Sequence, residues 1–128
     1  MIPKFRAWLK REKKMVDVKK LTFVEGKVRC VFYRTGTEDH DSDILSSACY
    51  EGVTFKLMQS TGVLDDNGVE IYEGDVIIPD GGGASLVHWK DGAFQVGYYG
   101  DIPYVLADYK SITVIGNIYE NPELLQEV

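Results

Sequence analysis

The sequence predicts a mainly β fold, with N-terminal β-hairpins, a small barrel or sandwich in the C-terminal half, and a short helical tail. Short apolar runs recur at intervals of roughly 8–12 residues, and a turn-forming cluster separates each run from the next. Strands and helices do not alternate in the βαβ pattern of dinucleotide-binding and P-loop folds. The 128 residues, 45% of them hydrophobic, suit a single globular domain.

The first predicted element is a β-hairpin over residues 4–18. Apolar residues occupy alternate positions in 5–9 and resume in 15–18, a period of two that is typical of strands. The polar run 10–14 between them supplies the turn. A helix is the alternative, because residues 8–15 include good helix formers, but the alternation at both ends favours the hairpin.

A second hairpin is predicted over residues 21–33. β-branched and aromatic residues flank a turn at Gly26, which can adopt a positive φ. A polar, acidic stretch follows. Within it, residues 42–50 predict a short helix with Ser42 or Asp43 as its N-cap.

The C-terminal half is dominated by the stretch LMQSTGVLDDNGVEIYEGDVI at 57–77. Its Asn67-Gly68 pair is a strong turn signal, because both residues tolerate a positive φ. The PDGGG run at 79–83 predicts a loop, and Pro122 suits the first position of a helical tail. Strands are expected at 55–58, 69–72, 76–78, 86–89, 94–98 and 112–118. Core positions are expected at Leu57, Ile71, Val76 and Ile77.

Positive charge is concentrated at the N-terminus. Residues 1–20 hold eight Lys or Arg and two acids, a formal charge of +6, whereas the whole chain carries −6. A basic arm can bind nucleic acid, can meet an acidic face of another subunit, or can be a solvated turn. Candidate nucleic-acid contacts are Arg6, Lys10, Arg11, Lys13 and Lys14.

The cysteines and the apolar runs bear on location. Cys30 and Cys49 form no CxxC pair and have no ligand cluster around them, so we expect idle thiols in a reducing compartment. No apolar run approaches the ~18 residues of a membrane span. The N-terminus also lacks the apolar core of a secretion signal. These features predict a cytoplasmic protein.

The sequence offers no catalytic constellation, and we expect no enzyme activity and no cofactor. His88 is a potential base, although a strand histidine satisfied by a neighbour is the simpler interpretation. Asp39 and Asp41, in an acidic loop at 38–43, resemble the start of a calcium loop. That loop would need glycine where Ile44 stands and a bidentate glutamate where Tyr50 stands. A weak metal-dependent activity through Asp39, Asp41 and His88 is the remaining enzymatic alternative.

Several segments together resemble the YopX protein family of phages and prophages of Gram-positive bacteria. They are KFRAW at 4–8, the stretch at 57–77, VHW at 87–89 and ITVIGNIYENPELL at 112–125. The resemblance implies an SH3-like small barrel in the C-terminal half, assembly into homo-oligomers, and no established activity. It predicts one domain, with a hairpin region at 1–54, a barrel at 55–120 and a tail at 121–128. The segment 36–53 departs from the family pattern.

These observations predict a non-enzymatic phage accessory protein that acts as an oligomeric protein-interaction module. Its partners would be further copies of itself and an unidentified host or phage protein, and no membrane is implied. Nucleic-acid binding by the basic hairpin is the alternative function. The interaction surface would include Tyr72, Glu73 and Asp75, at an exposed end of the 57–77 stretch, and Tyr119, since tyrosine suits a rim or an interface.

Overall fold

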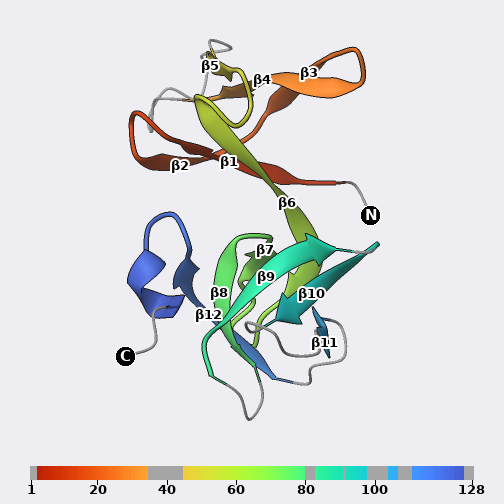
Figure 1. Cartoon of the computed structure of the whole chain (residues 1–128), viewed down its shortest axis with the longest axis vertical. Coiled ribbons are helices and arrows are strands. Elements are labelled where there is room, and N and C mark those ends of the chain that lie inside the picture. Colours follow the sequence, from red (N-terminus) through yellow and green to blue (C-terminus); the bar gives the residue numbers. More distant parts are fainter. Residues whose placement is uncertain are drawn as a thin grey trace. The chain divides into compact units, whose positions relative to one another are not determined.

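The structure is a computed structural model that describes residues 3–34, 45–79, 83–90, 92–97, 104–106 and 111–125. The chain divides into an N-terminal unit, Lys4–Met58, and a C-terminal unit that begins at Gln59. The boundary lies inside one long strand, β6 (Figure 1). The sequence placed the boundary between its hairpin and barrel regions at residue 55; that boundary and a single domain over the whole chain stay predictions.

The N-terminal unit contains both predicted hairpins. Its strands are β1 (Phe5–Leu9), β2 (Lys14–Asp17), β3 (Lys20–Val24), β4 (Lys27–Tyr33), β5 (Ser46–Cys49) and the first part of β6 (Phe55–Leu64). β1 pairs with β2 in antiparallel register, with Trp8 opposite Met15, so the helical alternative for residues 8–15 is wrong. β3, β4 and β5 form a three-stranded antiparallel sheet.

The predicted helix at 42–50 is also wrong where the structure describes it. Ser46–Cys49 is strand β5, which pairs along β4 and places Ala48 against the core. An isolated helix of this length is only marginally stable in water, so pairing of the segment with the adjacent strand β4 is the more stable arrangement. The proposed N-caps Ser42 and Asp43, and the acidic loop 38–43, lie outside the described residues.

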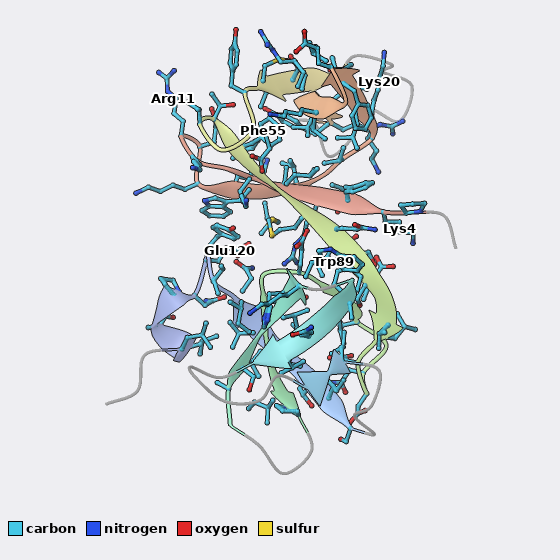
Figure 2. The ribbon with its side chains drawn as sticks, turned by 45° about the vertical axis from the view of Figure 1, so that its right-hand side comes forward. Lys4, Arg11, Lys20, Phe55, Trp89 and Glu120 are labelled. Atoms are coloured by element: carbon cyan, nitrogen blue, oxygen red, sulfur yellow. A yellow bond between two sulfur atoms is a disulfide. The ribbon has the colours of Figure 1, made fainter. Side chains whose placement is uncertain are left out.

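Side chains from β1, β2, β4 and β6 form one hydrophobic core in the N-terminal unit. The fully or almost fully buried members are Ala7, Leu9, Val16, Val31 and Phe55. Partly buried neighbours, including Leu57, pack around them, which agrees with the core assignment of Leu57. β1 and β2 supply one side of this core and β4 the other, with Phe55 of β6 between them (Figure 2).

Cys30 and Cys49 form a disulfide, which corrects the expectation of two idle thiols. They lie directly opposite each other in the β4–β5 register. Their spacing of 19 residues gave no sign of this in the sequence, because the pairing depends on β5 being a strand. The bond joins β5 to the centre of its sheet.

The C-terminal unit is built mainly on a five-stranded antiparallel sheet that curls into a half barrel (Figure 1). Its strand order is β11-β10-β9-β8-β12, and β7 pairs with the second part of β6. The bounds are β7 (Glu70–Tyr72), β8 (Asp75–Pro79), β9 (Ser85–Lys90), β10 (Ala93–Gly97), β11 (Tyr104–Val105) and β12 (Ile112–Asn117). The mainly β prediction is confirmed, and the closer likeness to an SH3 barrel stays a prediction.

One detail of this unit differs from the sequence-based expectation: Pro79 is the last residue of β8, opposite Ile112, and not the first residue of a loop. The predicted short helical tail is confirmed as a 3-10 helix, Pro122–Leu125. The core contains Ile71, Ile77, Val87, Val96, Leu106 and Ile112, and Val76 is buried as well.

None of the helices that the structure describes is long and apolar enough to cross a membrane.

Asp65 holds the DNG turn to the edge of the barrel sheet. One carboxylate oxygen accepts the backbone N–H groups of Asn67 (2.9 Å) and Val69 (2.8 Å). The other accepts the N–H of Val114 in β12, at 3.0 Å. Gly68 takes the positive φ of 80° that the turn requires. These hydrogen bonds lower the pKa of Asp65, the bond from Val114 most of all, against an opposing effect of burial.

The tail packs against β12 at Gly116. A side chain there would place its Cβ 2.5 Å from Asn121 Oδ1 and 2.8 Å from Leu124 Cδ1. Asn117 closes the same corner, since its side-chain oxygen accepts the N–H groups of Tyr119 and Glu120. The run VIGNIYENPELL is therefore explained by close packing of the tail onto the strand.

We expect Gly116→Ala to lower the free energy of unfolding by about 2 kcal/mol, because the added methyl group must displace Asn121 and Leu124. Urea unfolding followed by circular dichroism measures the change. Gly83→Ala is the matched control: nothing lies within 4 Å of its Cβ position, so its effect should stay within about 0.5 kcal/mol. Equal stabilities of the two variants would contradict the close-packing argument.

Candidate functional site

The N-terminal unit has an open groove of about 370 Å³. It is bounded by β5, by the turn between β1 and β2, and by the turn that leads from β5 into β6. The lining residues are Arg11, Glu12, Tyr33, Ser47, Ala48, Cys49, Tyr50 and Thr54. This volume is near the lower limit of ligand sites in proteins, which range over roughly 300–1,000 Å³.

β5 turns backbone hydrogen-bonding groups toward its outer edge. In an antiparallel pair, residues whose N–H and C=O meet the partner strand alternate with residues whose groups point away. The carbonyl of Phe32 accepts the N–H of Lys19 and therefore points away from β5. Ser47, which is opposite Phe32, accordingly turns its N–H and C=O away from β4. Cys49 does the same, and its carbonyl accepts the Thr54 hydroxyl.

Tyr50 lines the groove in an uncommon backbone conformation. Its φ is 73°, which is rare for a bulky side chain. Its carbonyl accepts the N–H groups of Val53 and Thr54, so the chain reverses immediately after β5. The Arg29 guanidinium lies 4.3 Å from the centre of the Tyr50 ring and donates to its hydroxyl at 3.0 Å. These contacts hold an aromatic ring that is 55% exposed.

The β1–β2 turn provides the charged wall of the groove. Arg11 and Glu12 line the groove, and Arg11 projects from the turn (Figure 2). Lys10 donates from Nζ to the carbonyl of Gly52 at 2.5 Å, which connects the two turns. Burial raises the pKa of Tyr33, and the negative charge of Glu12 raises it further. The Tyr33 hydroxyl is therefore a neutral hydrogen-bonding group at physiological pH.

The groove has the chemistry of a binding site. Its lining offers backbone N–H and C=O groups, tyrosine and threonine hydroxyls, one guanidinium and one carboxylate. Within the described part of the chain, no three His, Cys, Asp or Glu residues gather as a metal site would require. The absence of enzyme activity and of a cofactor stays a prediction.

The structure separates the five candidate nucleic-acid residues. Lys10, Arg11, Lys13 and Lys14 are exposed on or beside the β1–β2 turn, and Arg11 lines the groove. Arg6 is half-buried within β1. The sequence missed Tyr33, Tyr50 and the edge of β5, because it interpreted residues 42–50 as a helix. The one sequence signal for this site was an aromatic residue, Tyr50, two positions before the turn-forming Gly52.

The predicted interaction surface is only partly exposed. Asp75 is 2% exposed, so the structure does not place it at an exposed end of the 57–77 stretch. Its carboxylate accepts the N–H of Tyr72 at 2.8 Å and closes the turn. Glu73 accepts the N–H of Gln59 at 2.9 Å. Tyr72, Glu73 and Tyr119 are half-buried, and each is tied into a local turn.

The candidate catalytic residues remain apart or undescribed. His88 is half-buried on β9, and its Nδ1 lies 3.4 Å from the carbonyl oxygen of Leu86. This contact agrees with a strand histidine satisfied by a neighbour. Asp39 and Asp41 lie outside the described residues, so the alternative of a metal-dependent activity stays untested.

Comparisons with known proteins match nearly the whole chain. A protein family described as "YopX protein" matches residues 4–126. The crystal structure of protein EF1440 from Enterococcus faecalis is 30% identical, with a TM-score of 0.72; the match covers 98% of this chain and 99% of that one. The crystal structure of yopX from Bacillus subtilis is 24% identical, with a TM-score of 0.67, and covers 98% and 97%. The search of curated proteins gave no match.

Proposed function

The chain belongs to the YopX protein family, and from this premise we propose that it is a non-enzymatic phage or prophage accessory protein acting as an oligomeric protein-interaction module. It assembles with copies of itself in the host bacterial cytoplasm and binds a host or phage protein.

The observation that carries the proposal is the separation of charge between the two units. Residues 4–58 hold 12 of the 14 Lys and Arg against eight acids, a formal charge of +4. Residues 59–128 hold two Lys and 12 acids, a formal charge of −10. The basic unit of one copy therefore attracts the acidic unit of another. Because the two surfaces differ, such contacts run head to tail and close into a ring or continue as a filament.

Size-exclusion chromatography with light scattering tests this assembly. We expect a mass well above the 14.4 kDa of one chain at about 50 mM salt, and dissociation as salt screens the charges. Joint replacement of Lys10, Arg11, Lys13 and Lys14 by glutamate should weaken the assembly. Lys90→Glu, which adds negative charge to the acidic unit, is the control and should preserve it. A single-chain mass at every salt concentration would overturn the proposal.

Nucleic-acid binding is the second candidate, because the β1–β2 turn exposes four cations and one of them, Arg11, lines the same groove as Tyr50. Stacking on aromatic rings combined with cations is how many proteins hold single strands. It ranks second because the C-terminal unit repels phosphate. Fluorescence anisotropy with a labelled single-stranded DNA decides: binding that falls steeply with salt and is lost in the four-residue variant supports it. No binding at low salt removes it.

A further inference from the structure

The outer edge of β5 offers a short row of backbone groups to another strand. Ser47 presents its N–H and C=O, and Cys49 presents its N–H, on the side away from β4. In the described part of the chain, no strand pairs with this edge. An exposed edge of this kind binds an extended peptide by main-chain hydrogen bonds. Pairing with β4 on one side holds β5 as a strand before any partner arrives.

The groove limits what can occupy this edge. The β1–β2 turn bounds it together with β5, so an incoming extended segment has to lie between the two. A volume of about 370 Å³ holds a few residues of such a segment. Tyr33 and Tyr50 supply aromatic walls, and Tyr50 is held in place by Arg29.

The positive charge of the β1–β2 turn favours an incoming segment that is negatively charged. Residues 10–14 expose four cations and one acid, a net charge of +3, and Arg11 and Glu12 both line the groove itself. An acidic side chain on the incoming segment can reach Arg11, whose planar guanidinium suits a carboxylate. A basic segment would meet net positive charge and be disfavoured.

We propose that the groove beside β5 receives an extended acidic peptide segment of a partner protein, which adds to β5 as a further strand. The peptide backbone donates to Ser47 C=O and accepts from the N–H groups of Ser47 and Cys49, while an acidic side chain pairs with Arg11. The inference rests on the proposed role as a protein-interaction module and names the surface and the kind of partner.

Selection from a library of random peptides of about eight residues tests this site on the full chain. We expect enrichment of acidic, strand-forming peptides, and their dissociation constants are then measured by fluorescence anisotropy. Ser47→Pro removes the outward N–H without removing a bond of the β4–β5 ladder, and should weaken binding about tenfold. Ser47→Ala keeps the N–H and is the matched control, expected to bind like the unmodified chain.

Two further measurements distinguish a loss of the binding site from misfolding of the Ser47→Pro variant. Arg11→Glu alters only an exposed side chain and should weaken the same peptides several-fold. Methylation of alternate peptide nitrogens should abolish binding to the unmodified protein, since the ladder to Ser47 is lost. Enrichment of basic peptides, equal binding by Ser47→Pro and Ser47→Ala, or no enrichment would each overturn the site.

The result is separable from that of the assembly experiment. A chain that stays monomeric at every salt concentration but binds acidic peptides through Ser47 would remove self-assembly and leave the groove in place. A chain that assembles but selects no peptide would remove the groove and leave self-assembly in place.

Discussion

Asp65→Ala is expected to lower the free energy of unfolding by about 4 kcal/mol. The change removes a carboxylate that accepts three backbone N–H groups, those of Asn67, Val69 and Val114. Hydrogen bonds to a charged group contribute roughly 1.5–3 kcal/mol each, and water replaces part of the loss at a surface turn. Hydrogen exchange at Val114 should report the largest change, because its bond ties the turn to β12.

Asp66→Ala is the matched control. Asp66 is exposed and accepts a hydrogen bond from the Ser111 hydroxyl and a long one, 3.4 Å, from the N–H of Ile112. We expect it to cost less than half as much as Asp65→Ala. Equal losses from the two substitutions would show that Asp65 has no special role at this corner.

The same carboxylate gives the protein a pH dependence of known sign. The folded-state pKa of Asp65 is lower than its unfolded value, so its contribution is complete above the unfolded pKa. That contribution is lost as the pH falls below about 4 toward the folded-state pKa. Asp65→Asn should flatten this part of the stability–pH profile while keeping some of the hydrogen bonds. A variant profile parallel to that of the unmodified chain would contradict the assignment.

Phe55→Ala is expected to destabilise the N-terminal unit by about 3–5 kcal/mol. Phe55 is fully buried in the cluster that also contains Leu9 and Val31, so truncation leaves a cavity in addition to lost apolar burial. In a Trp89→Phe background, Trp8 of β1 is the remaining tryptophan and reports unfolding of this unit in urea. Peptide binding in the groove should weaken as well, because the Phe55 carbonyl accepts the N–H of Gly52 in the turn after β5 and a shift of Phe55 would disturb that turn.

Val53→Ala is the control for Phe55. Val53 lies in the same turn but is 73% exposed, so its effect should stay within about 0.5 kcal/mol. If both substitutions cost the same, Phe55 is not the centre of the core. Comparing peptide binding by the two variants also shows how far the groove depends on that core.

The two proposed binding interactions act over different distances. Separation of charge acts over many ångströms, favours encounter and is sensitive to salt. The edge of β5 acts only at hydrogen-bond distance and selects an extended backbone. A module with both would gather partners by charge and retain those with a strand-forming acidic segment.

The sequence by itself determined the local elements whose residues specify them directly. Alternating apolar positions predicted β1 and β2, and the Asn67-Gly68 pair predicted the turn that Asp65 completes. Local patterns were sufficient there because strand alternation and turn conformation depend on adjacent residues. The core positions expected at Ile71 and Ile77 are buried as well.

Only the tertiary structure decided the identity of β5, and with it the disulfide and the groove. Ser46–Cys49 has no strong preference of its own, and the ladder along β4 makes it a strand. Asp75 looks exposed in a polar turn, yet it is buried because its carboxylate satisfies the N–H of Tyr72. Contacts between residues far apart in the chain outweigh weak local preference, and the groove is built from three segments that only folding brings together.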